Sequence, residues 1–230
     1  MSAAPLSLLS SMATQALITD LIAAWQAGQP DQPVRAEAVG GVDAAKRVQG
    51  GEAVDIVFLA AKAIDTLIAA GRLQGPRIDI VRSGIAVAVR DGAPRPDIGS
   101  EDAVRAAVLA APTLSYSTGP SGVYLEGLFA RWGILDEIRP RIVQAPAGVP
   151  VGSLVADGRV ALGFQQLSEL MSLPGIAVLG PLPDAIQSIT TFSAAVGADC
   201  TRPERARALL ASFNAASAVA LKQRHGMAPA

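Results

Sequence analysis

Cysteine and histidine are almost missing from this chain of 230 residues, which has one of each. Cys200 alone can form neither an internal disulfide nor a cysteine-based zinc cage. His225 lies in a polar tail rich in Ala and Pro, a poor setting for a catalytic base. The same count excludes a histidine-based metal site and a Ser-His-Asp triad. We therefore expect no metal site and no cofactor.

Positive charge is also limited, because 19 Lys and Arg residues stand against 20 Asp and Glu residues and no basic run occurs. Nucleic acid and anionic membrane are therefore not expected as partners. The apolar segment 5–25 is interrupted by polar residues, and membrane insertion is not expected. The first Lys or Arg is Arg35, so the positive region of a secretory signal is missing. We expect a cytoplasmic protein as the sequence is written, and a periplasmic one if a signal peptide was removed.

Small aliphatic residues are abundant: half of the chain is hydrophobic although only 4% is aromatic. Strand and helix patterns alternate, which predicts an α/β fold with a mostly parallel sheet. Two long extended runs, near 78–90 and 176–196, divide the chain. They predict two α/β lobes joined by two crossing segments, with a ligand cleft between the lobes. The expected lobes are residues 1–81 plus 188–230 and residues 82–187, and a single doubly wound sheet is the alternative.

Three local expectations follow from the same patterns. The first extended run is expected to break at Arg82-Ser83-Gly84. A short strand is expected over 141–144, where apolar residues follow Arg141. The last amphipathic pattern predicts one helix over 202–220, with Pro203 allowed in its first turn.

The segment 115–124 combines a short strand, a turn rich in Ser, Thr, Gly and Pro, and the start of a helix. Backbone amides at a helix start are unpaired and favour negative charge. Hydroxyls beside them suit a carboxylate or a tetrahedral oxyanion. A phosphate loop would need a Lys-Ser/Thr pair, which this segment lacks. The candidate ligand contacts are Ser117, Thr118, Ser121 and Gly122, and an ordinary capped helix is the alternative.

Several segments together resemble a known family. They are Leu8-Leu-Ser-Ser-Met-Ala-Thr-Gln15, Gly40-Gly-Val-Asp43, Asp55-Ile-Val-Phe-Leu-Ala60, Ser121-Gly-Val-Tyr124 and the segment 156–164. Their order and spacing resemble the molybdate-binding branch of solute-binding proteins, which have the two-lobed type II periplasmic binding fold. The resemblance implies a small-anion-binding component of an ABC transporter, with ligand contacts at helix starts that face the cleft.

The resemblance also implies particular ligand residues. Ser11, with Ser10 before it, lies where the family places its first hydroxyl ligand. Gly41 lies where molybdate binders carry a second serine, and Gln166 lies near the tyrosine that closes over molybdate. These two departures from the family argue against molybdate itself. The hydroxyl missing at Gly41 would leave an oxyanion oxygen unsatisfied, which costs roughly 1–3 kcal/mol.

Other polar residues supply a different set of donors. Arg82 and Ser83 fall at the first crossing between the lobes, where an Arg can hold a carboxylate bidentately. Alternatively, Arg82 is a hinge residue paired with a nearby Asp such as Asp79. Gln165 and Gln166 could orient a planar acid or only cap the next helix.

Two functions remain open. The first is a binding protein for an organic carboxylate or oxyanion, with a transporter permease as partner only if the chain is exported. The alternative is an isomerase without a cofactor, similar to relatives of this branch that shift a double bond in aconitate-like acids. Such a reaction needs a base and stabilisation of an enolate-like charge. Lys62 and Tyr124 are the first candidates for the base, although a solvated lysine and a core-edge tyrosine are the alternatives; Asp43 and Glu126 are the nearest carboxylates.

Overall fold

The computed structural model describes residues 4–146 and 148–230. The chain divides into two compact units, Met1–Arg82 with Thr191–Ala230 and Ser83–Thr190. The first unit contains β1 (Leu6–Ser11), η1 (Met12–Thr14), α1 (Gln15–Gly28), β2 (Val34–Val39), α2 (Gly41–Gln49), β3 (Ile56–Ala60), α3 (Ala61–Ala69), most of β8 (Ile189–Gly197), α9 (Pro203–Phe213), η4 (Ala216–Ala218), α10 (Val219–Arg224) and β9 (Ala228–Pro229). The second contains α4 (Glu101–Ala110), β5 (Leu114–Tyr116), α5 (Pro120–Arg131), α6 (Leu135–Ile138), η2 (Arg139–Arg141), α7 (Val151–Ala156), β6 (Leu162–Gln166), α8 (Leu167–Leu170), β7 (Ile176–Pro181) and η3 (Asp184–Ile186). β4 (Leu73–Arg90) runs from the first unit into the second.

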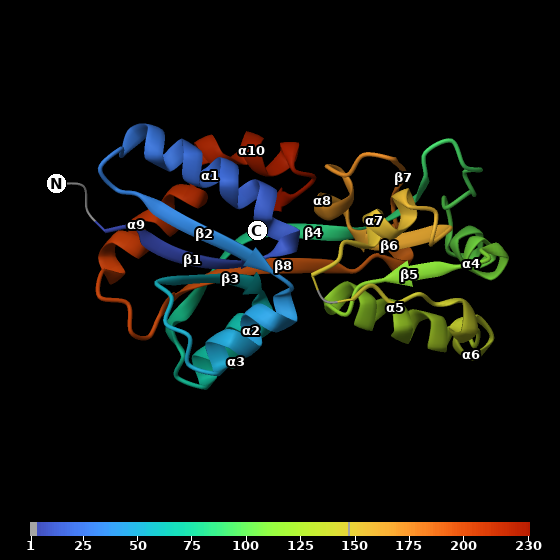
Figure 1. The fold of residues 1–230 in the computed structure, drawn as a ribbon, viewed down its shortest axis with the longest axis horizontal. Coiled ribbons are helices and arrows are strands. Elements are labelled where there is room, and N and C mark those ends of the chain that lie inside the picture. Colours follow the sequence, from blue (N-terminus) through green and yellow to red (C-terminus); the bar gives the residue numbers. More distant parts are fainter. Residues whose placement is uncertain (1–3, 147) are drawn as a thin grey trace. The chain divides into compact units, whose positions relative to one another are not determined.

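The sheet of the first unit lies between two layers of helices (Figure 1). Its strand order is β2-β1-β3-β8-β4, with β1 parallel to both β2 and β3, and β8 antiparallel to β3. α1, α9 and α10 cover one face and α2 and α3 cover the other. The residues of β3 explain why helices cover both faces. Ile56 and Phe58 join the core under α1 and α9, whereas Val57 and Leu59 join the core under α2 and α3. Successive strand residues point to opposite faces, so an uninterrupted apolar strand is buried on both.

The second unit repeats this design on a smaller scale. β5 and β6 are parallel, and β4 is antiparallel to β6 and β7. α4 and α5 pack over one face, where Phe129 and Phe164 meet edge to face at 6.1 Å between ring centroids. α7 packs on the other face, where Gly163 leaves room for Val155. Because β5 and β6 are parallel, their carboxyl ends lie at the same edge of this sheet.

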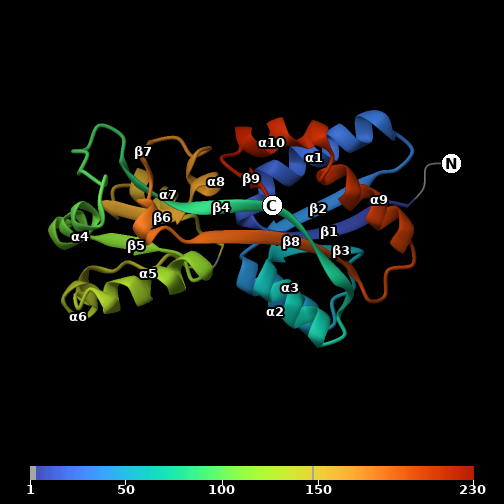
Figure 2. The ribbon, with the colours of Figure 1, turned by 180° about the vertical axis from the view of Figure 1, so that it is seen from behind.

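Two strands, β4 and β8, pass between the units and lie side by side in both ribbon views (Figures 1 and 2). The expected break at Arg82-Ser83-Gly84 is wrong, because β4 is one strand of 18 residues. Arg82 pairs with Ala228 and Ile85 pairs with Gln166, so ladder hydrogen bonds hold the backbone extended on both sides of the triplet. The predicted ligand cleft between the lobes stays a prediction.

Two other local expectations are also wrong. Residues 141–144 form no regular strand, and only Ile142 makes a single bridge with Leu114 after the turn η2. The final helix ends at Phe213, because the side chain of Asn214 donates to the carbonyl oxygen of Asp79 at 2.9 Å and the chain turns there. α10 then begins six residues later, at Val219, and its buried Lys222 donates to Asn214 Oδ1 at 2.8 Å. Burial lowers the pKa of this lysine.

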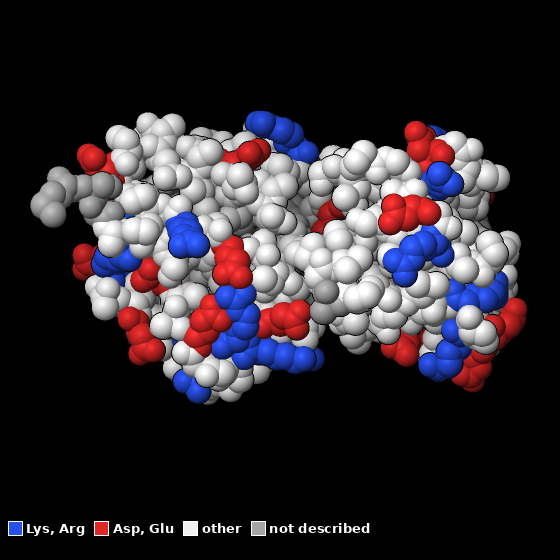
Figure 3. Space-filling model, in the orientation of Figure 1, with Lys and Arg blue, Asp and Glu red and all other residues white. Residues whose placement is uncertain are grey.

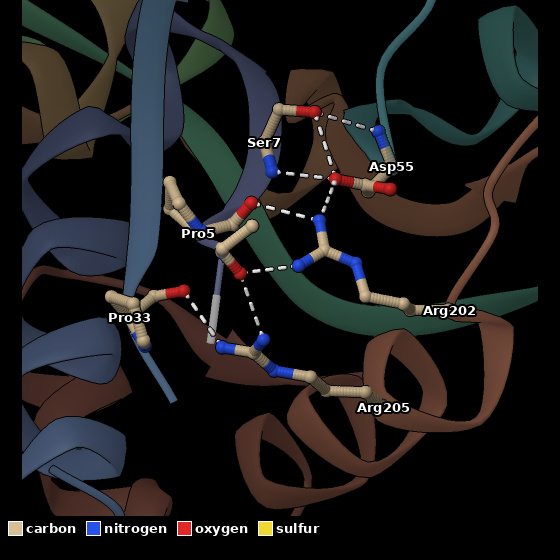
Figure 4. A network of polar contacts seen from close by, with 7 residues as sticks. Pro5, Ser7, Pro33, Asp55, Arg202 and Arg205 are labelled. Carbon is tan, nitrogen blue, oxygen red and sulfur yellow. Dashed lines mark hydrogen bonds and ion pairs between the residues drawn. The ribbon is translucent and has the colours of Figure 1, made fainter. Parts of the chain in front are cut away.

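A polar network ties the start of β1 to α9 and to the start of β3 (Figure 4). Asp55 Oδ2 accepts from the backbone N–H of Ser7 at 2.8 Å and from the guanidinium of Arg202 at 3.3 Å. Arg202 also donates to the carbonyl oxygen of Pro5 at 2.8 Å, and Arg205 donates to that of Pro33 at 2.9 Å. Burial raises the pKa of Asp55, but the hydrogen bonds from Ser7 and from the Cys200 thiol, with the charge of Arg202, outweigh burial and hold the pKa below its ordinary value.

Candidate functional site

Three parallel strands of the first unit end at one edge of its sheet, and a helix begins directly after each. β1 ends at Ser11, β2 leads to α2 at Gly41, and β3 leads to α3 at Ala61. In open α/β sheets the carboxyl ends of the strands are where ligands bind. The first amides of these helices have no partner inside the helix and carry the positive end of its dipole. This edge can therefore hold negative charge.

The structure brings Ser11 and Gly41 together at this edge. A Cβ atom added to Gly41 would lie 3.5 Å from the Cβ atom of Ser11. The Ser11 hydroxyl is buried and lies 3.4 Å from the hydroxyl of Thr14. Ser10 is buried as well, but its hydroxyl donates to the carbonyl oxygen of Glu37 at 3.4 Å, and neighbouring strand residues point to opposite faces. Ser11 is thus beside Gly41, whereas the Ser10 hydroxyl contacts β2.

Three charged candidate residues of the first unit are less buried than Ser10 and Ser11. Lys62 is exposed in the first turn of α3, and Asp43 is half-buried in the first turn of α2. Arg82 is exposed, and its Nε and Nη2 donate to the carbonyl oxygen of Pro229 at 3.2 and 3.1 Å. The suggested pairing of Arg82 with Asp79 is wrong, because Asp79 binds Arg77 at 2.8 Å. A role of Arg82 in ligand binding stays a prediction.

The carboxyl edge of the second unit is built around the loop 117–119. The hydroxyls of Ser117 and Ser121 lie 3.3 Å apart, and Ser117 Oγ accepts from the backbone N–H of Gly119 at 3.3 Å. A Cβ atom at Gly122 would lie 1.6 Å from the carbonyl oxygen of Ser117, so only glycine allows α5 to begin this close to the loop. Thr118 is exposed. The structure therefore gathers two hydroxyls and the first amides of α5, which spans 12 residues and has no side-chain cap.

Gln166 and Ser83 place two buried polar atoms near the end of β6. Gln166 is 3% exposed, and its Nε2 donates to Thr190 Oγ1 at 3.0 Å. Its Oε1 has no hydrogen-bond partner among the described residues, and neither does Ser83 Oγ. Ser83 lies two residues before Ile85, which pairs directly with Gln166, so the two side chains share a face of the sheet. An unmet buried oxygen costs about 1–3 kcal/mol, which favours a polar partner at this position.

Glu169, on α8, is a residue that sequence reasoning missed. It is half-buried, and burial raises its pKa to about 7, while a hydrogen bond from Gln165 acts in the lowering direction. Gln165 is 2% exposed, and its Oε1 accepts from the backbone N–H of Gly152 at 3.3 Å. The sequence did contain a signal, because Glu169 is the only charged residue between Arg159 and Asp184. A single charged residue in such a stretch is a signal that sequence reasoning could have used.

Tyr124 and Glu126 of α5 have other surroundings. The phenol of Tyr124 donates to the carbonyl oxygen of Ile186 at 2.9 Å and so ties α5 to η3. Glu126 is exposed.

Charged side chains of both signs are interspersed on the face of each unit drawn in Figure 3, without a large patch of one sign. Among the described residues no group of His, Cys, Asp and Glu is arranged to hold a metal ion, and no helix is long and apolar enough to cross a membrane.

Known proteins match this chain over most of its length. A family model described as bacterial extracellular solute-binding protein matches residues 6–228. An aconitate isomerase from Pseudomonas sp. is 42% identical over 178 residues, which cover 75% of this chain and 68% of that protein. 

Solved structures with the same fold are more distant in sequence. The periplasmic molybdate-binding protein of Azotobacter vinelandii superposes with a TM-score of 0.79 at 18% identity, covering 96% of this chain and 98% of its own. The sulfate-binding protein SubI of Mycobacterium tuberculosis gives 0.79 at 17% identity, covering 99% and 87%. These likenesses confirm the predicted α/β fold of the type II periplasmic binding proteins.

Proposed function

We propose, from the premise that the chain belongs to the bacterial extracellular solute-binding protein family, that it binds a small organic anion with two or three carboxylate groups. The observation that carries this proposal is the loop at the start of α5. There the Ser117 and Ser121 hydroxyls lie beside the first amides of a 12-residue helix. Hydroxyl donors and the positive end of a helix both stabilise a carboxylate. The edge around Ser11 and Gly41 offers a second set of the same kind.

Two observations favour a carboxylate over a tetrahedral oxyanion. The relative at 42% identity is an aconitate isomerase, whereas the molybdate- and sulfate-binding proteins are 18% and 17% identical. In addition, the edge at Ser11 has no second hydroxyl, because Gly41 stands next to it.

The test is a calorimetric titration of the full chain with citrate, cis-aconitate, trans-aconitate, succinate, molybdate, tungstate and sulfate. We expect the tricarboxylates to bind. Ser121→Ala should weaken them by about 10- to 150-fold, since a hydrogen bond to a charged group contributes roughly 1.5–3 kcal/mol. The matched control is Ser100→Ala, which removes the hydroxyl that caps α4 of the same unit through the N–H of Ala103. Binding of the metal oxyanions or sulfate alone would refute the carboxylate proposal.

A second candidate function is the isomerisation of an aconitate-like acid by proton transfer. It is favoured by the 42% identity with aconitate isomerase and by a half-buried carboxyl group, Glu169, whose pKa is about 7. A general base works best when its pKa is close to the working pH. The test is proton NMR of cis-aconitate with the protein in deuterated water. We expect the trans isomer to form and deuterium to enter the carbon skeleton. If neither change occurs, this candidate function is refuted.

The cellular compartment decides whether a transporter can be a partner. A membrane permease would receive the ligand from this protein only if the chain is exported. Fractionation of cells that produce the protein with a carboxyl-terminal tag separates the two cases, because an exported protein is released by osmotic shock and a cytoplasmic protein is retained.

A further inference from the structure

We propose that Glu169 moves the proton in this isomerisation and that Gln165 positions it, an inference that rests on the second candidate function. Gln165 fixes the carboxyl group through a two-sided contact. Its Oε1 accepts from the N–H of Gly152, so its amide N–H groups are the ones that donate to Glu169. Because Gln165 is 2% exposed, this carboxamide has little freedom to turn. The carboxyl group of Glu169 is therefore held in one place by a neutral donor.

Burial without an ion-pair partner distinguishes Glu169 from Asp55 and Asp79. None of the ion pairs among the described residues involves it, whereas Asp55 and Asp79 are each paired with an arginine. Gln165 is the one side chain that acts on its pKa besides burial. An ion-paired carboxylate stays ionised, but an unpaired carboxyl group with a pKa of about 7 exists in both forms at neutral pH. It can then take up a proton and return it.

The position of Glu169 also fits a ligand at the carboxyl edge of the second unit. α8 follows directly on β6, and β6 is parallel to β5, whose end leads to the loop of Ser117. Gln166 Oε1 and Ser83 Oγ, both buried and without a partner among the described residues, lie near the same strand end. A ligand placed beyond the strand end is open to side chains from both faces of the sheet. This strand end therefore combines anion donors, unmet polar atoms and one carboxyl group.

The other candidate bases are less suited to the role. The phenol of Tyr124 already donates to the carbonyl oxygen of Ile186, and Glu126 and Lys62 are exposed. Asp43 belongs to α2 in the first unit and is half-buried there.

The proposed step conserves atoms and charge. The ionised carboxylate of Glu169 takes a proton from the CH₂ group beside a carboxylate of cis-aconitate. The C–H electron pair forms a new C=C bond, and the electrons of the old C=C bond move toward the adjacent carboxylate, whose negative charge the hydroxyls and amides stabilise. The rotamer about the bond to the CH₂ carbon fixes the geometry of the new C=C bond, and the trans isomer forms when the two carboxylates on that bond lie on opposite sides of it. Glu169 then returns the proton to the former vinyl carbon, which leaves trans-aconitate and an ionised Glu169.

The experiment compares three variants of the full chain, Glu169→Gln, Glu169→Asp and the control Glu126→Gln. For each, cis-aconitate binding is measured by calorimetry and isomerisation by NMR. We expect Glu169→Gln to lower kcat by roughly 10²- to 10⁴-fold, as loss of a general base does, while binding is retained. Glu169→Asp should recover part of the rate, and Glu126→Gln should change neither quantity. In the unmodified protein kcat/KM should rise with pH to a plateau above about 7, as the carboxylate forms.

The outcomes separate this role from the function on which it rests. A protein that neither binds nor isomerises aconitate overturns the second candidate function and the role of Glu169 with it. Binding without isomerisation leaves the carboxylate proposal in place and overturns the role of Glu169. Isomerisation that is equally fast in Glu169→Gln overturns that role alone. If Glu169→Gln does not fold, a pH profile of the unmodified protein without a rise near 7 has the same consequence.

Discussion

The contact between Gln165 and Glu169 can be tested without any ligand, by replacing Gln165 with Met. Methionine has a similar length and suits a buried site, but it cannot donate a hydrogen bond. The hydrogen bond from Gln165 stabilises the ionised form of Glu169 and so acts to lower its pKa, against the larger effect of burial. Removing that bond leaves burial unopposed, and the pKa of Glu169 must rise above about 7.

The size of this change follows from the energy of the bond. A hydrogen bond to a charged group contributes roughly 1.5–3 kcal/mol, and one pH unit of pKa corresponds to about 1.4 kcal/mol. The pKa of Glu169 should therefore rise by roughly 1 to 2 pH units in Gln165→Met. The same variant leaves the buried N–H of Gly152 without its acceptor, so it should also unfold more easily, by about 1–3 kcal/mol.

The assay is a pH titration of the side-chain carboxyl carbon by NMR on protein labelled at glutamate, with Glu169→Gln identifying the signal. Gln166→Met is the matched control, since the neighbouring glutamine bonds to Thr190 instead. That control should leave the pKa of Glu169 unchanged. Stability offers a second readout: because the folded pKa lies above the ordinary value of 4.5, stability should fall as pH rises from about 4.5 to about 7, and the fall should vanish in Glu169→Gln. An unchanged or lowered pKa in Gln165→Met would refute the bridging contact.

Two further predictions concern the scaffold. Arg202→Ala should lower the free energy of unfolding by about 2–3 kcal/mol in urea denaturation, because a partly buried guanidinium that binds two carbonyl oxygens and a carboxylate is lost. The control Arg139→Ala removes an exposed ion pair and should lower it by less than about 0.5 kcal/mol. Equal effects of the two variants would contradict the network of Figure 4. Gly122→Ala should destabilise the protein by more than about 3 kcal/mol and abolish carboxylate binding, since its Cβ atom would meet a backbone oxygen at 1.6 Å. Gly127→Ala, in open space on the same helix, should stabilise it by about 0.5–1 kcal/mol, and a similar effect of both alanines on binding would refute the tight loop.

Much of the fold could be predicted because its signals are local. Buried strands such as Ile56–Ala60 are continuous apolar runs that lead into helices, and this alternation dictates a parallel sheet with helices on both faces. The errors arose where distant pairing decides the structure. The triplet at Arg82 resembles a turn in sequence, but it is extended because β9 and β6 pair with its two sides. The helix end at Phe213 likewise depends on a contact of Asn214 with Asp79, 135 residues away in sequence.

The candidate site divides in the same way. The Ser117–Gly122 segment could be found from sequence because a helix start after a strand is a local pattern, and the structure places its two serines 3.3 Å apart. Glu169 could not be assigned a role from sequence, because its pKa depends on burial and on where the carboxamide of Gln165 points. The pattern Gln-Gln-Leu-Ser-Glu suggests only a capped helix, and it becomes chemically distinctive once Gly152 of another helix binds the Gln165 oxygen. Hydroxyls and helix starts thus predict where an anion binds, whereas a proton-transfer group is recognised only when its uncharged surroundings are known.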